Sequence, residues 1–175
     1  MNEPAVNLHA DADPPALPPL GLTWGIKRSF VRYLSGLPDA QVSATDGAEI
    51  VEGSLFNFQS AGGSFDAATR TGVLRFRGDV RLSGHYGMMF VQLLDPWVEF
   101  TADGAVLTIG EPGVDTRYPL ATLQAAPDSP VDAEGGQLWE GVQTALSAAG
   151  SETFNDQYPA GQPMDPLFIR IPAPA

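Results

Sequence analysis

Frequent glycine and proline residues constrain the fold of this chain more than any other feature of its sequence. There are 19 glycines and 16 prolines in 175 residues, about one residue in five. Both residues interrupt helices, and both are common in turns between strands. Only 17% of the residues are charged, fewer than is usual in a globular domain. This composition favours a turn-rich, mainly β structure in a chain long enough for one domain with its own core.

The segment 22–36, LTWGIKRSFVRYLSG, contains the first expected element of structure. Its apolar residues recur at a spacing of four, as on one face of a helix: Leu22, Ile26, Phe30 and Leu34. Gly36 then ends the pattern. We therefore expect a helix over the whole segment. On it, Ser29 and Tyr33 lie four residues apart and project from the same face.

Short alternating runs separated by turn residues follow this segment and predict strands. They lie at 72–82 with a bulge at Gly78, at 88–94, on both sides of the turn ADG, and at 116–124, 137–146 and 167–171. A second short helix is expected to start at Ser147. Together these elements predict a mainly β fold, a two-sheet β-sandwich-like domain with two short α-helices.

The ends of the chain suggest a simple domain organisation. Residues 1–20 contain five prolines, so we expect a Pro-rich flexible tail, followed by a single domain over 21–172. The tail lacks the basic and apolar regions of a signal peptide, and no run approaches the length of a membrane-spanning helix. We therefore expect no direct membrane insertion by this chain.

Charge narrows the classes of partner. A net charge of −12 and a pI near 4.3 argue against binding to nucleic acid or to an anionic membrane. The few basic residues form two clusters, Lys27, Arg28 and Arg32, and Arg70, Arg75, Arg77 and Arg81. Each cluster is either a solvated face or a site for a small anion. The absence of cysteine excludes disulfides and thiolate ligands to a metal.

Motifs for common catalytic or metal-binding chemistry are absent. There is no GxSxG elbow, no glycine-rich phosphate loop and no HxxEH zinc motif. What remains is a set of tyrosines with His85, the one histidine outside the N-terminal tail. A tyrosinate binds ferric iron, and an adjacent imidazole can donate a hydrogen bond to it. Taken alone, Tyr33 is more often a packing residue, and Met88 and Met89 are more often core residues than ligands.

Four blocks of the chain resemble a known family. They are LTWGIKRSFVRYLSG, GVLRFRGDVRLSGHYG, LLDPWVEF and AAGSETFNDQYPAGQPMDPLFIRI. These blocks are similar to successive parts of the HtaA domain, the haem-binding module of actinobacterial haem-uptake systems, over roughly residues 21–171. The family fold that this resemblance implies is predominantly β with two short helices.

The resemblance also implies roles for individual residues. Tyr33 on the first helix would be the axial ligand to the iron of ferric haem, and His85 would hydrogen-bond that tyrosine. Ser29 would contact a haem propionate. Tyr158 would pack on or beside the porphyrin, with Gln157 next to it.

Tyr86 departs from the family pattern. It stands with Met88 and Met89 where relatives usually have small or polar residues. A bulky side chain there either changes how open the pocket is or contacts haem directly.

The function that follows is binding of haem b (ferric protoporphyrin IX) and its transfer to other haem-carrier or haem-receptor proteins in iron acquisition. We expect no enzymatic activity, and a monomer or weak dimer. The family implies a secreted or cell-surface protein, although a chain without an export signal or anchor leaves a cytoplasmic location open. Two alternatives are a ligand-free structural or interaction β-domain and a haem-dependent peroxidase or catalase-like enzyme. The enzyme would need a proton-handling residue that no second histidine in the domain supplies.

Overall fold

Strands dominate the computed structural model, which describes residues 18–124 and 135–172. The first 17 residues of the expected tail lie outside the described residues. In chain order the strands are β1 (Gly21–Trp24), β2 (Gln41–Thr45), β3 (Ala48–Val51), β4 (Leu55–Asp66), β5 (Thr71–Arg77), β6 (Asp79–Gly84), β7 (Met89–Thr101), β8 (Gly104–Gly110), β9 (Arg117–Gln124), β10 (Gln137–Leu146) and β11 (Pro163–Ile171). The helices are α1 (Arg28–Ser35) and α2 (Ala148–Thr153). None of the helices in the described ranges could span a membrane.

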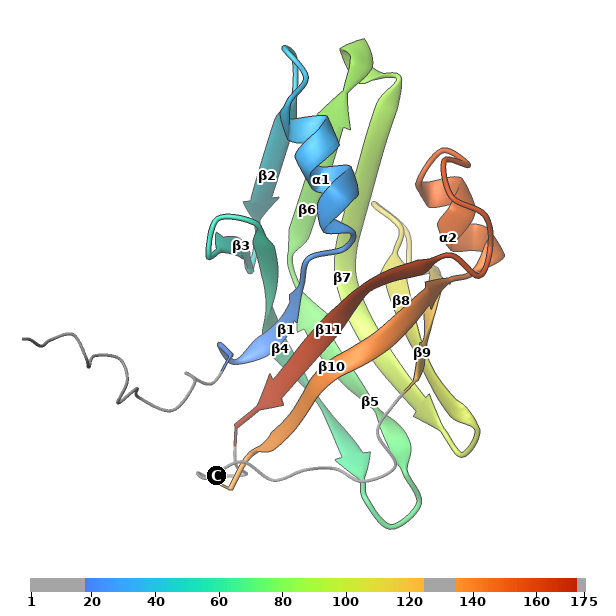
Figure 1. The fold of residues 1–175 in the computed structure, drawn as a ribbon. Helices are drawn as coiled ribbons and strands as arrows, with labels where there is room; N and C mark the ends of the chain where they lie inside the picture. Colours follow the sequence, from blue (N-terminus) through green and yellow to red (C-terminus); the bar gives the residue numbers. More distant parts are fainter. Residues whose placement is uncertain (1–17, 125–134, 173–175) are drawn as a thin grey trace, which may run out of the picture.

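Eight of the strands close into a barrel, so the expected two-sheet sandwich was wrong. Neighbouring strands pair in the order β7-β5-β4-β1-β11-β10-β9-β8, and β8 pairs again with β7 (Figure 1). Strands β6 and β2 extend beyond the barrel from β7, and β3 pairs with β4. Sandwich and barrel strands share the same alternation of inward and outward residues. That alternation therefore predicts the strands but not the closure of the sheet.

Strand β7 takes part both in the barrel and in the extension, because it is long enough to pair with different strands along its two halves. Its N-terminal half pairs with β6, and its C-terminal half pairs with β5 and β8. The two halves meet at Asp95, where φ is +44° and the register with β8 shifts between Leu94 and Trp97. This irregularity bends the strand without ending it. The expected hairpin at ADG is confirmed, with Thr101 opposite Gly104.

The segment 22–36 contains a strand followed by a helix, where the apolar spacing predicted one continuous helix. Residues Gly21–Trp24 form β1, which pairs with β4 on one side and β11 on the other. The chain then turns through Ile26 with φ +64° before α1 begins. All four apolar residues behind the prediction are buried, but in different elements: Leu22 lies on β1, Ile26 in the turn, and Phe30 and Leu34 on α1. The spacing therefore predicted correctly which residues are buried, but a helical period describes only the part of the segment that forms α1.

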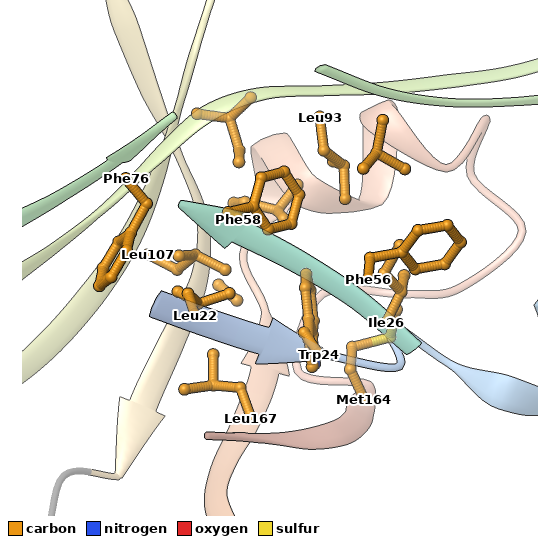
Figure 2. Packing of buried hydrophobic residues seen from close by; sticks show 14 of the residues in the cluster. Leu22, Trp24, Ile26, Phe56, Phe58, Phe76, Leu93, Leu107, Met164 and Leu167 are labelled. Carbon is orange, nitrogen blue, oxygen red and sulfur yellow. The ribbon is translucent and has the colours of Figure 1, made fainter. Parts of the chain in front are cut away.

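Large aromatic side chains fill the barrel around β1 and β4. Figure 2 shows Trp24 and Leu22 of β1 packed with Phe56 and Phe58 of β4, and with Leu167 of β11. Each of these side chains is at most 1% exposed. Ile26, in the turn that leads to α1, joins the same cluster. The start of the helix is therefore anchored directly in the barrel core.

Asp165 of β11 holds the first turn of α1 from a distant part of the sequence. The backbone N–H of Arg28 donates to its carboxylate at 3.0 Å, and its own N–H donates to the carbonyl of Ile26 at 2.9 Å. The indole N–H of Trp24 donates to the Asp165 carbonyl at 2.6 Å. Lys27, the residue before the helix, supplies no capping side chain. Asp165 thus takes the part of an N-terminal cap, satisfying a helix N–H that has no partner within α1.

Replacing Asp165 with alanine should destabilise the domain. The substitution removes the carboxylate that accepts from the helix N-terminus, so we expect the free energy of unfolding to fall by about 1–2 kcal/mol. Urea denaturation followed by circular dichroism measures this change. Asp115→Ala, at an exposed position, is the matched control and should change stability by less than about 0.5 kcal/mol. Equal effects of the two substitutions would contradict the capping role.

Candidate functional site

Tyr33 and His85 form a direct side-chain contact at the surface. The Tyr33 Oη and the His85 Nε2 are 2.8 Å apart, although the residues are 52 positions apart in the sequence. Tyr33 projects from α1, and His85 begins the turn between β6 and β7. The two rings are inclined at 45° with centroids 5.9 Å apart. Sequence reasoning therefore selected two side chains that the fold brings into hydrogen-bonding distance.

A close approach of α1 to the end of β6 sets this distance. Helix α1 packs against β6 through its apolar face. A Cβ atom on Gly84 would lie 2.7 Å from the Cδ1 of Leu37 and 2.9 Å from that of Leu34, closer than carbon atoms can pack. Glycine at this position thus allows the helix to sit directly on the strand end that leads to His85.

The turn that carries His85 has an unusual backbone. His85, Tyr86 and Gly87 all have positive φ, at +52°, +58° and +86°. This region is disfavoured for residues with a side chain, and such conformations are typical of functional sites. The carboxylate of Asp39, in the loop after α1, accepts a hydrogen bond from the Tyr86 N–H. The turn is therefore tied to the segment that follows the helix.

Exposed aromatic and apolar side chains lie in the turn that carries His85 and at the start of the strand after it. Tyr33 is 56% exposed, Tyr86 90%, Met88 84% and Phe90 46%. We call Tyr86 and Met88 the apolar patch. Phe90 lies opposite Ser83, and so faces away from the side of the β6–β7 pair on which α1 packs against Gly84. Met88 was expected in the core, and its exposure shows that expectation to be wrong. Met89, in contrast, is buried as expected and packs in the core. Large apolar side chains grouped at a surface often mark a binding site.

Two of the other predicted residues, Ser29 and Tyr158, lie on or against α1. Ser29 is exposed one turn before Tyr33. The ring of Tyr158 packs edge-on against Phe30, with centroids 6.1 Å apart, and lies 5.5 Å from the Lys27 ammonium. Gln157, next to Tyr158, is exposed. Ser29 thus shares a helix face with Tyr33, whereas Tyr158 reaches the helix through other residues.

Burial distinguishes the tyrosines as potential anionic ligands. Desolvation raises the pKa of both Tyr118 and Tyr158 above the ordinary tyrosine value, so both phenols stay neutral at physiological pH. Tyr33 is exposed and has an imidazole beside its oxygen. A phenolate at Tyr33 would keep its solvation and gain a hydrogen bond from His85. Tyr33 is therefore the better of these three phenols for binding a hard cation.

This donor set fits ferric haem. In the described ranges no three His, Asp or Glu side chains cluster as a metal site would require. A tyrosine oxygen is one of the axial ligands that haem iron takes, with the porphyrin supplying the ring ligands, and a hydrogen bond from His85 could orient and tune that oxygen. The neighbouring apolar patch offers surface to a flat apolar molecule. Asp39 and Asp165 support the site, but no local motif in the sequence marks either residue.

Comparisons with known proteins agree with this fold. A family model described as HtaA matches residues 20–170. The C-terminal domain of HtaA from Corynebacterium glutamicum is 24% identical, with a TM-score of 0.69 over 85% of this chain and 94% of that one. A domain-swapped dimer of an H434A variant of that domain is 23% identical, with a TM-score of 0.65 over 93% and 98% of the two chains.

The haem-binding protein HtaB from the same organism is 19% identical, with a TM-score of 0.64 over 85% of this chain and 90% of that one. At these identities the solved structures support the fold alone. No curated protein matches the chain. The family match, in contrast, spans nearly the whole domain. The chain therefore belongs to the HtaA family.

Proposed function

We propose that this domain binds ferric haem through the phenolate of Tyr33 and passes it to another protein. The observation that carries the proposal is the 2.8 Å contact between the exposed Tyr33 oxygen and His85 Nε2. Membership of the HtaA family supports it, as does a fold shared with a haem-binding protein. The cargo would be haem b, held without a covalent bond.

His85 would control the proton of Tyr33. A phenol ordinarily ionises near pH 10, so its oxygen needs help to bind iron as a phenolate at neutral pH. His85 Nε2 is placed to accept the phenol proton, and the resulting N–H then donates to the phenolate. Such a charge-assisted hydrogen bond is stronger than a neutral one. The negative ligand favours ferric over ferrous iron by charge matching.

The remaining predicted residues would hold the porphyrin. Ser29 would donate a hydrogen bond to a propionate, and Tyr158 with Gln157 would flank the ring. Tyr86 would contact the porphyrin together with the rest of the apolar patch.

Exposure of the site suits transfer. More than half of the Tyr33 side chain is open to solvent, so a partner protein could approach the iron ligand directly. Displacement of the Tyr33 oxygen from the iron by a partner protein would release the cargo. A role in haem uptake would place the protein in secreted form or at the cell surface.

Replacing Tyr33 with phenylalanine should remove the iron ligand while keeping the ring. We expect haemin affinity to fall at least tenfold, on the order of the loss seen when groups supporting a metal are removed. The absorbance bands that report a phenolate on ferric iron should disappear. A haemin titration followed by absorbance measures both effects.

Tyr118→Phe is the matched control, because Tyr118 is a half-buried tyrosine bonded to Thr153. It should bind haemin like the unchanged protein. Equal binding by the Tyr33 and Tyr118 variants would refute ligation by Tyr33. A wild-type protein without a specific Soret band would instead favour a ligand-free domain, and sustained turnover of peroxide would favour an enzyme.

Replacing His85 with asparagine should weaken haemin binding without abolishing it. Asparagine tolerates positive φ, so the turn can persist while the imidazole is lost. We expect about tenfold weaker binding and shifted charge-transfer bands. In a Tyr33→Phe background the same substitution should have no effect on affinity, because no phenolate is left to stabilise. Additive effects in the double variant would show that His85 acts independently of Tyr33.

Removing the apolar patch should lower affinity while keeping the iron ligand. In the double variant Tyr86→Asn/Met88→Ser we expect about three- to tenfold weaker haemin binding, because less apolar surface leaves water. The phenolate absorbance bands should persist. Val114→Ser, at an exposed apolar residue outside the patch, is the control and should leave affinity unchanged. Unaltered binding by the double variant would exclude contact between the patch and haem.

A further inference from the structure

The turn that carries His85 adopts a conformation that its own residues do not favour. One hydrogen bond closes it, from the Met88 N–H to the His85 carbonyl at 3.1 Å. Tyr86 and Gly87 at its centre both have positive φ, as in the type I′ turn of a hairpin. Asparagine or aspartate usually precedes the glycine of such a turn, and this chain has tyrosine there. His85 adds a third positive φ, of +52°, with no glycine to relieve it.

Contacts from outside the turn must therefore hold it, because a strained backbone persists only where the surrounding structure fixes it. The segment 33–39, which contains the end of α1 and the loop after it, supplies two hydrogen bonds. Tyr33 meets the imidazole of His85 through its phenol oxygen. The carboxylate of Asp39 accepts from the backbone N–H of Tyr86. The first bond involves the functional side chain, and the second involves the backbone beside it.

The Tyr86 N–H belongs to the peptide unit that directly follows the Cα of His85. Its direction is set by ψ of His85 and φ of Tyr86, two of the angles that define the strained turn. An acceptor for this N–H therefore holds the backbone next to the Cα that carries the imidazole. Without the acceptor, the peptide unit is free to rotate toward a commoner region of φ and ψ. The imidazole would then lose its fixed position beside Tyr33.

Asp39 is well placed to hold the turn. It follows Pro38, whose ring fixes φ, and the loop is closed by a hydrogen bond from the Ala40 N–H to the Leu37 carbonyl at 3.2 Å. Its side chain is half-buried. Within the described ranges its carboxylate forms no ion pair with His85. Asp39 thus acts on the backbone of the turn and not as a charged partner of the imidazole.

We propose that Asp39 is a positioning residue, whose carboxylate holds the turn so that His85 Nε2 meets the Tyr33 oxygen. A hydrogen bond to a charged acceptor is stronger than a neutral one, which suits the carboxylate to a strained backbone. The effect of Asp39 on haem rests on the function proposed above, whereas its effect on His85 is present without haem. Asp39 touches neither the iron nor the porphyrin, so it supports haem binding only by way of His85.

Nuclear magnetic resonance of the haem-free protein tests the positioning directly. The ring nitrogen signals of His85 are identified by their absence in His85→Asn. In Asp39→Ala we expect these signals to shift toward their values in Tyr33→Phe, in which the phenol partner is missing. Asp39→Asn keeps an oxygen that can accept from the Tyr86 N–H, so its His85 signals should stay close to those of the unchanged protein.

Haemin titration tests the consequence for the ligand. Asp39→Ala should bind haemin about three- to tenfold more weakly, and no more weakly than His85→Asn does. Asp39→Asn should stay within about twofold of the unchanged protein. In a His85→Asn background, Asp39→Ala should have no further effect, because the side chain that it positions is gone. Asp115→Ala removes another exposed carboxylate and should bind haemin like the unchanged protein. Circular dichroism checks that each variant is folded.

Two results would overturn the positioning role. One is a set of unchanged His85 signals in Asp39→Ala, and the other is a loss of haemin affinity that is equally large with and without His85. Failure of the proposed function gives a different result, since haemin binding would then be insensitive to Tyr33→Phe. The His85 signals of the haem-free protein would still report whether Asp39 positions the imidazole.

Discussion

Strand β7 holds the molecule together, because one half of it closes the barrel and the other half carries the β6 extension. Pairing of its C-terminal half with β5 and β8 closes the eight-stranded barrel. Its N-terminal half then projects past the barrel with β6 and ends at the turn that holds His85. The site lies on this extension, so its geometry depends on how firmly β7 is fixed in the barrel below it.

Contacts at the start of α1, along the helix and at the His85 turn bring the site together. Asp165 and the core packing of Ile26 fix the start of α1 on the barrel, while Gly84 lets the helix rest on the end of β6. Asp39 then ties the turn to the segment after the helix. The backbone of that turn is strained and its side chains are exposed, which costs stability. Under the proposed function, these costs would serve to present one oxygen atom and an apolar surface to haem.

Local patterns predicted elements better than their assembly. The strand expected at 137–146 coincides with β10, and the helix expected to start at Ser147 is α2, which begins at Ala148 with Ser147 as its N-terminal cap. Barrel closure could not be predicted, because it depends on which distant strands pair. Leu22 of β1 continued the helical spacing of α1 by coincidence.

For the candidate site too, some residues could be selected from the sequence, whereas other contacts required the three-dimensional structure. Tyr33 and His85 came from a family resemblance, and their contact agrees with the roles it implies. The capping by Asp165 joins residues 137 positions apart, and the exposure of Met88 follows from a three-dimensional turn. Neither leaves a periodic signal in the sequence.

The central claim is that a Tyr33 phenolate, hydrogen-bonded by His85, binds the iron of haem. Resonance Raman spectroscopy of the ferric haem complex tests it most directly, because an iron–phenolate bond has its own vibrations. We predict that these vibrations are present in the unchanged protein, shift in His85→Asn and are absent in Tyr33→Phe. Iron–phenolate vibrations that persist in Tyr33→Phe, or that do not respond to His85→Asn, would contradict the account.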